Sequence, residues 1–107
     1  MFINVTEEQF LSIENNLYDE ALPAVLLFSS DQNNKSDEII NRLMTLSNDI
    51  MVPIYNVNIN EADSLAEKYY VGSEDVPCIL LFADGDVIDR FDERSSINMI
   101  IDRIMDI

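Results

Sequence analysis

The sequence has no histidine, no tryptophan and a single cysteine, Cys78. The absence of histidine removes the commonest general base and the commonest metal ligand at once. One thiol permits no intramolecular disulfide, and its rarity is typical of a protein in a reducing compartment. Dithiol–disulfide exchange needs an attacking and a resolving thiol, so this chain cannot carry out that reaction by itself.

Basic residues are scarce as well. Six Lys and Arg residues oppose 21 Asp and Glu residues, which leaves a formal net charge of −15. A field of this sign repels nucleic acid and anionic membranes, and it favours basic partners or plain solubility. We therefore expect a protein partner, preferably a basic one, and no direct binding to nucleic acid or membrane.

Long apolar runs, glycine and proline are also infrequent. No run approaches the ~20 residues of a membrane helix, and the N-terminus lacks the basic and apolar segments of a signal peptide. Only two Gly and three Pro residues occur while 48% of the chain is hydrophobic, which predicts a globular protein. We expect a single domain over residues 1–107 that is located in the cytoplasm.

One stretch, residues 76–91, predicts a buried β-hairpin. Residues 79–82 are apolar without polar alternation, which is typical of a strand buried on both faces. Pro77 precedes that strand, where its missing N–H is not needed, and the bond before it is a candidate for the cis form. Asp84-Gly85 then predicts a tight turn into a second strand, Asp86–Phe91.

Hydrophobic periodicity and capping residues predict the remaining elements. In order they are an edge strand over Phe2–Val5, a helix from the capping box Thr6–Gln9 to about Tyr18, a buried strand over Ala24–Phe28, a helix capped by Ser36, a strand over Met51–Ile59, a helix over Glu61–Tyr69 capped by Asn60, and, after the hairpin, a last helix capped by Ser95. The order β-α-β-α-β-α-β-β-α predicts an α/β fold with a central mixed sheet and helices on both faces. The strands on either side of each crossover helix are expected to be parallel.

The second half of this pattern resembles the C-terminal half of thioredoxins. The likeness consists of the Glu61–Val71 helix, Val76-Pro77, the buried strand and the Asp-Gly turn, and it extends back to Leu22–Phe28, which resembles the central strand of the family. It covers roughly residues 20 to 107. The resemblance implies a thioredoxin-like fold in which Pro77 is cis and borders the functional site.

The redox motif of that family is missing. In thioredoxins a Cys-x-x-Cys motif follows the central strand at a helix N-terminus, where the helix dipole and free amides lower the pKa of the first thiol. The matching window here is Gln32-Asn33-Asn34-Lys35, and Asp31 and Leu26 stand where the family usually has a tryptophan and a buried aspartate. The resemblance therefore implies a redox-inactive member that is not an enzyme and needs no cofactor.

Thioredoxins use this loop and the residue before the proline to hold extended polypeptide. We accordingly expect a binding or scaffold module, of a kind that suits a viral or phage protein acting on a host factor. The backbone of Val76 is expected to pair with a partner strand by β-augmentation. The predicted partner-binding residues are Ser30, Asp31, Gln32, Asn33, Asn34, Lys35, Val76, Pro77, Asp92, Glu93 and Arg94.

Several other interpretations remain open. The charge is also what an acidic mimic of nucleic acid needs in order to block a basic DNA- or RNA-binding protein. Cys78 is either a buried small hydrophobe or a lone thiol that forms a mixed disulfide with a partner. Lys35 and Asp31 stand in the loop like a charged pair, which has a catalytic use only beside a pocket.

Two further patterns carry no predicted site. The acidic residues from Asp84 onward do not form a calcium loop, because the sixth and twelfth positions hold Asp89 and Ser95 instead of Gly and Glu. No metal site is expected. Asn56, Asn58 and Asn60 alternate at the end of a strand, where they are expected to face solvent or cap the next helix.

Overall fold

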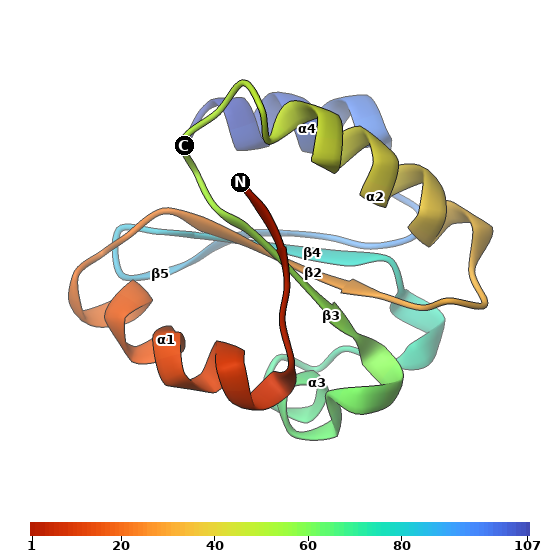
Figure 1. Ribbon diagram of the computed structural model, residues 1–107, viewed down its shortest axis with the longest axis horizontal. Coiled ribbons are helices and arrows are strands. Elements are labelled where there is room, and N and C mark those ends of the chain that lie inside the picture. Colours follow the sequence, from red (N-terminus) through yellow and green to blue (C-terminus); the bar gives the residue numbers. More distant parts are fainter.

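A five-stranded sheet lies between two pairs of helices in the computed structural model, which describes all residues 1–107 (Figure 1). The order of elements is the predicted one, with two added 3-10 turns. The strands are β1 (Phe2–Asn4), β2 (Ala24–Ser29), β3 (Ile54–Asn58), β4 (Cys78–Ala83) and β5 (Asp86–Phe91). The helices are α1 (Glu7–Asp19), α2 (Asn34–Leu46), α3 (Asp63–Lys68) and α4 (Ile97–Met105), with 3-10 turns η1 (Ile59–Glu61) and η2 (Ser73–Asp75).

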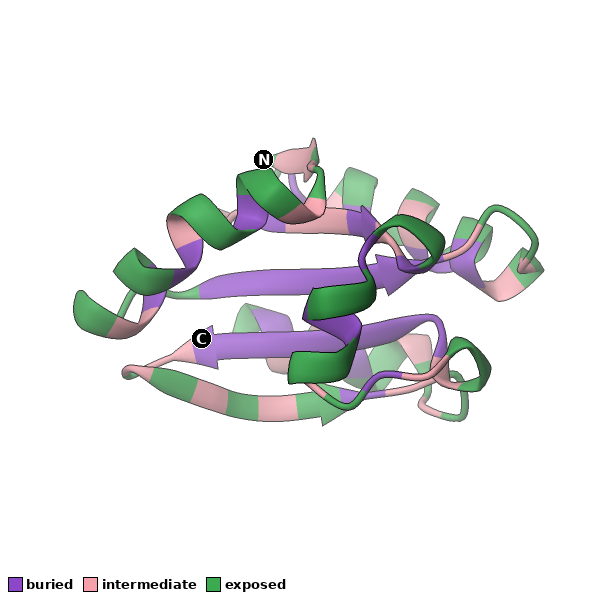
Figure 2. Ribbon diagram, turned by 90° about the horizontal axis from the view of Figure 1, so that it is seen from below, coloured by how far each residue is buried: buried purple, intermediate pink, exposed green.

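The strands are arranged in the order β1-β3-β2-β4-β5, with β3 parallel to β1 and β2, and with β4 antiparallel to β2 and β5. The two apolar runs of the sequence, β2 and β4, lie side by side within the sheet and are buried along almost their whole length (Figure 2). The edge strand β5 alternates between more and less exposed residues, as a half-covered strand does.

Alternate residues of the central strands supply two separate cores, because successive side chains of a strand point to opposite faces. Helices α1 and α3 cover one face, and α2 and α4 cover the other (Figure 1). The first core contains Leu26, Phe28, Cys78, Leu80 and Phe82 from β2 and β4, and the second contains Val25, Leu27, Ile79 and Leu81. Each large side chain buried in this way contributes about 1.5–3 kcal/mol.

The predicted capping box at Thr6 is confirmed, but two other caps are displaced. Asn33, not Ser36, caps α2, and its Oδ1 accepts the N–H of Ser36 at 3.0 Å. Ser96, not Ser95, caps α4, because the hydroxyl of Ser95 instead accepts the N–H of Asp92 at 3.1 Å. A short polar side chain serves a turn or a helix equally well, so the sequence alone does not distinguish the two roles.

The third strand and the third helix are shorter than predicted. Strand β3 begins only after Pro53, which has no N–H to give to the ladder, and it ends where η1 begins. Helix α3 has no side-chain cap, and it is Asn58 that accepts the N–H of Asn60, at 2.9 Å. The prediction that Asn60 caps a helix over residues 61–69 is therefore wrong.

The crossover through α3 also departs from the parallel arrangement that we expected. Strand β4 is antiparallel to β2, whereas β3 is parallel to it, so β3 and β4 run in opposite directions. Helix α3 has six residues and spans about 9 Å, too little to return along a strand of about 20 Å. The chain therefore turns back at the same end of the sheet.

The hairpin forms as predicted. Asp84 and Gly85 have φ values of 58° and 79°, the pair of positive angles that a type I′ turn requires. None of the four helices combines the length and the apolar character that a membrane crossing requires.

Candidate functional site

The side chain of Asn33 joins the loop after β2 to the segment before β4. Its Oδ1 caps α2, and its Nδ2 donates to the carbonyl oxygen of Val76 at 3.1 Å. The peptide bond between Val76 and Pro77 is cis, as the resemblance implies. One amide thus ties the start of a helix to the proline segment, across 43 positions of sequence.

Lys35 makes the second connection, from α2 to the turn after β5. Its Nζ donates to the carbonyl oxygens of Glu93 and of Ser95, the latter at 3.3 Å. Within that turn the N–H of Arg94 donates to Oδ1 of Asp92 at 2.9 Å, and this bond is the main cause that lowers the pKa of the Asp92 carboxyl. The carboxylate of Asp92 therefore stays charged and holds the turn.

The three predicted segments consequently lie together. We call residues 30–35, 76–77 and 92–94 the three-segment surface. Its exposed side chains are Asp31, Gln32, Asn34, Glu93 and Arg94; those of Ser30, Asn33, Lys35 and Asp92 are half-buried; and Val76 and Pro77 are buried.

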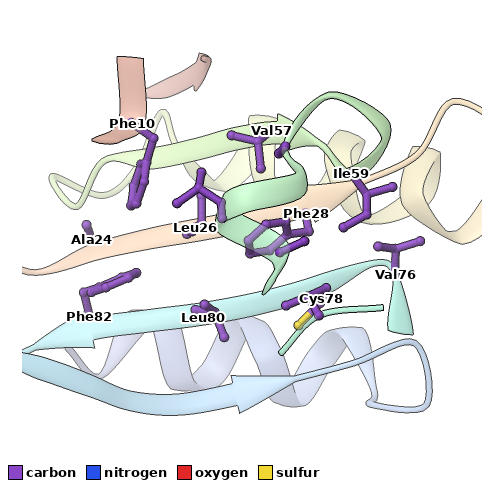
Figure 3. Packing of buried hydrophobic residues seen from close by; sticks show 14 of the residues in the cluster. Phe10, Ala24, Leu26, Phe28, Val57, Ile59, Val76, Cys78, Leu80 and Phe82 are labelled. Carbon is purple, nitrogen blue, oxygen red and sulfur yellow. The ribbon is translucent and has the colours of Figure 1, made fainter. Parts of the chain in front are cut away.

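The structure modifies the role expected of Val76. Its side chain is 3% exposed and lies in the first core, on the same side of the sheet as Cys78, Leu80 and Phe82 (Figure 3). Its carbonyl oxygen already accepts a hydrogen bond from Asn33. Only the backbone is therefore available for strand addition, and a partner that binds this carbonyl oxygen must share it with Asn33 or displace the Asn33 side chain.

Asp31 and Lys35 do not pair, so the charged pair suggested by the sequence is absent. Oδ2 of Asp31 instead accepts from Nδ2 of Asn58 at 3.4 Å, and Lys35 points to backbone carbonyls. The three hollows of the molecule do not include Gln32, Asn33 or Lys35 in their walls. Nothing in the loop forms an acid–base pair beside a pocket.

Cys78 lies inside the protein. The first residue of β4, it is 0% exposed and packs into the core beneath α1 and α3. Burial raises the pKa of its thiol to about 11, against a smaller opposing effect of the Arg90 charge. Because the thiolate is the reactive form, this environment favours the structural role of Cys78 over thiol chemistry.

Sequence reasoning placed Asn33 in the loop but missed its double role. The usable signal was the preference of asparagine for N-cap positions, since Asn33 stands in the polar break before the apolar stripe of α2. The bond to Val76 had no local signal.

The arrangement of the whole chain is similar to that of solved thioredoxins. Thioredoxin O2 of Arabidopsis thaliana, in its oxidized state, matches with a TM-score of 0.88 and 22% sequence identity over 99% of this chain and 93% of that one. Thioredoxin O1 of the same plant matches with 0.84 and 19% over 99% and 96%, and a mutant thioredoxin of Halobacterium salinarum NRC-1 with 0.80 and 19% over 98% and 88%. The chain has the thioredoxin fold.

Comparison with models of protein families finds no match, and neither does comparison with curated protein sequences. The likeness is therefore one of three-dimensional structure. Within this thioredoxin fold neither the loop after β2 nor helix α2 contains a cysteine, and the single cysteine, Cys78, lies in β4.

Proposed function

We propose that this chain is a redox-inactive, thioredoxin-like protein-binding module that works in the cytoplasm and is not an enzyme. The observation that carries the proposal is the bond between Asn33 and Val76. It occupies the junction between the helix N-terminus and the cis-proline, where the thiol of Cys78, the residue after the proline, is fully buried in the core. What remains of a thioredoxin site without thiols is its surface for polypeptide.

Hydrogen bonds within the chain connect the parts of the three-segment surface. Asn33 and Lys35 connect its segments to each other, and the hydrogen bonds that Arg94 donates to Asp92 hold the turn. A surface ordered in advance loses little conformational entropy on binding, which favours affinity.

Charge favours a basic partner. Asp31 and Glu93 are exposed on the three-segment surface, whereas its two cations, Lys35 and Arg94, are engaged with Glu93, Ser95 and Asp92. Complementary charge mainly accelerates association and selects the partner.

The test is affinity capture from the native cell extract, followed by mass spectrometry. Val76 is unsuitable for substitution because its side chain is in the core. The variant Gln32→Arg/Glu93→Arg changes two exposed side chains, and Asn16→Arg/Glu20→Arg, at the C-terminal end of α1 and its C-cap, makes the same change in net charge outside the three-segment surface.

The expected partner remains bound to the wild type and to the Asn16→Arg/Glu20→Arg control at about 0.5 M NaCl. At this salt concentration, attraction between exposed charges more than about 4 Å apart is largely screened. It is lost from the Gln32→Arg/Glu93→Arg variant. A partner that both variants retain equally contradicts the proposed surface.

A second candidate function is an acidic mimic of nucleic acid, which also suits a viral or phage factor. The observation that favours it is that every basic side chain is already engaged within the chain. Lys68 pairs with Glu14, Arg94 with Asp92, and Arg103 with both Asp89 and Asp106. Lys35 and Arg90 donate to backbone carbonyl oxygens, and Arg42 donates to the side-chain amide oxygen of Asn98. The other carboxylates have no cation within 4 Å.

The same capture experiment distinguishes the two candidates. A mimic retains basic nucleic-acid-binding proteins at low salt and releases them steeply as salt rises, because released counterions dominate such contacts. The Gln32→Arg/Glu93→Arg variant and the Asn16→Arg/Glu20→Arg control then lose binding to the same extent.

A further inference from the structure

A polar hollow of about 400 Å³ opens beside the three-segment surface. It lies at the carboxyl ends of the parallel strands β1, β3 and β2, between the start of α1 and the middle of α2. Ligands of open α/β sheets commonly bind at this end of the strands. Asp31 belongs both to this hollow and to the three-segment surface, so the two are continuous.

The wall of the hollow is a fixed row of hydrogen-bonded side chains. Nδ2 of Asn56 donates to Oδ1 of Asn4 at 2.9 Å, and the hydroxyl of Ser29 donates to Oδ1 of Asn56 at 2.8 Å. Nδ2 of Asn58 then reaches Oδ2 of Asp31 at 3.4 Å. These hydrogen bonds orient the side-chain amides. The amide oxygens of Asn4 and Asn56 accept hydrogen bonds from neighbouring residues of the wall.

Two carboxylates remain for a ligand. Glu61 makes no hydrogen bond or ion pair, and Asp31 accepts only the long bond from Asn58. No basic side chain lines the hollow. With two carboxylates that have no cation and no basic side chain in its lining, the hollow favours a positively charged ligand over an anion.

Other ligand classes fit less well. The backbone N–H groups of Thr6 and Gln9, the lining residues at the start of α1, are used by the capping box and are not free for an anion. No aromatic side chain is present in the lining on which a sugar ring would stack.

We propose that this hollow binds an arginine side chain of the protein partner. The guanidinium presents several N–H donors in one plane, which match carboxylate oxygens in pairs. The inference rests on the proposed function, since a basic segment lying on the three-segment surface passes Asp31 and can place one side chain in the hollow.

The probe is N-acetyl-arginine methylamide, titrated into the labelled protein and followed by the NMR signals of the Asn4, Asn56 and Asn58 side-chain amides. The matched neutral probe is N-acetyl-citrulline methylamide, which has the same shape without the charge. The test variant is Asp31→Asn/Glu61→Gln, and the control is Glu20→Gln/Asp102→Asn, which removes the same charge from exposed positions outside the hollow.

We expect the arginine probe to shift the three amides and the citrulline probe to bind about tenfold more weakly, as the loss of a charge-assisted pair implies. The test variant should weaken arginine binding by a similar factor, and the control by less than about twofold, because distant charges are screened. Equal weakening in both variants, or shifts scattered over the surface, would show attraction by net charge alone and overturn the site.

A captured partner separates this inference from the proposed function. Glu61 lies in the hollow but outside the three-segment surface. A partner that Glu61→Gln leaves unchanged and Gln32→Arg/Glu93→Arg releases supports the function and refutes the arginine site. If the arginine probe binds the hollow but no captured protein depends on residues 30–35 and 92–94, the proposed function is refuted and the arginine site is supported.

Discussion

Among single residues, Asn33 connects two segments of the candidate site through its side chain. Its Oδ1 caps α2 and its Nδ2 donates to Val76. Asn33→Asp keeps the cap and loses the donor, whereas Asn33→Ala loses both. We expect the free energy of unfolding, measured by urea titration, to fall by about 1 kcal/mol for Asp and about 2 kcal/mol for Ala.

The control for these variants is Gln32→Ala, in the same loop. Gln32 is exposed, and its side chain makes no hydrogen bond, so the free energy of unfolding should change by less than about 0.5 kcal/mol. If Asn33→Asp proves as stable as the wild type, the bond to Val76 contributes nothing to stability.

Cys78 makes stability depend on alkaline pH. Burial raises the pKa of its thiol from 9.0 to about 11. Between these pH values the unfolded chain binds fewer protons than the folded one, so the free energy of unfolding falls as pH rises; below pH 9 this contribution is fully present. Cys78→Ala should be less stable at neutral pH, because it leaves a cavity, but should lose less stability between pH 9 and 11.

The check is the difference in slope between the two proteins in urea titrations at several pH values, since the tyrosines contribute equally to both. Alkylation by iodoacetamide is a second measurement. Cys78 should react only after unfolding, and modification of the folded protein would restore the lone-thiol interpretation.

Between elements, a buried cluster ties α1 to α3. Glu14 is 3% exposed, and it accepts hydrogen bonds from Lys68 Nζ at 2.7 Å and from the hydroxyl of Tyr69. Burial, together with Glu14, raises the pKa of Tyr69, so its hydroxyl stays a donor. Lys68→Met leaves the buried carboxylate without its cation, and we expect the free energy of unfolding to fall by about 2 kcal/mol.

Arg42→Met is the matched control for that prediction. Arg42 is exposed and donates only to Oδ1 of Asn98, at 3.1 Å. Its loss should change the free energy of unfolding in urea by less than about 0.5 kcal/mol. Equal effects of the two substitutions would mean that the Glu14 cluster is no more than a surface contact.

The elements that the sequence predicted well are those with a purely local cause. Strands β2 and β4 have unbroken apolar runs, and the turn at Asp84-Gly85 needs positive φ values that glycine accepts. The starts of α2 and α4 were misplaced because several polar residues compete for each cap. The direction of β4 relative to β3 depends on the short reach of α3, which periodicity does not report.

The candidate site was predicted as a set of segments and not as a set of contacts. Resemblance to thioredoxins placed residues 30–35 beside Val76-Pro77, and the structure joins them. The resemblance did not indicate that the side chain of Val76 is buried. The sequence of a loop does not show whether a residue exposes its side chain or only its backbone. The hollow at Asn4, Asn56 and Asp31 was missed, since three strands far apart in sequence build it.

Over the whole molecule, the charges are divided unevenly between internal and external roles. All six cations make hydrogen bonds within the chain, while most of the 21 carboxylates have no cationic partner. All the basic residues except Arg94, which pairs within its own turn, therefore connect different parts of the chain, as Lys35 and Lys68 do. The net charge of −15 therefore comes from carboxylates that have no cationic partner.

This surplus should make the folded state sensitive to salt. Like charges repel more strongly in the compact chain than in the unfolded one, and salt screens them beyond about 10 Å at 0.1 M. We expect the free energy of unfolding to rise by about 1 kcal/mol between about 0.01 M and about 0.2 M NaCl, measured by urea titration at pH 7.

The variant Asn16→Arg/Glu20→Arg tests whether repulsion is the cause. It lowers the surplus of negative charge at two exposed positions, one in α1 and one at its C-cap, so it should be more stable than the wild type at low salt and should gain less from added NaCl. Salt could instead weaken the ion pairs of Lys68 and Arg103, in which case stability would fall as NaCl rises. The sign of the change thus decides whether unpaired or paired carboxylates dominate the electrostatics of the folded chain.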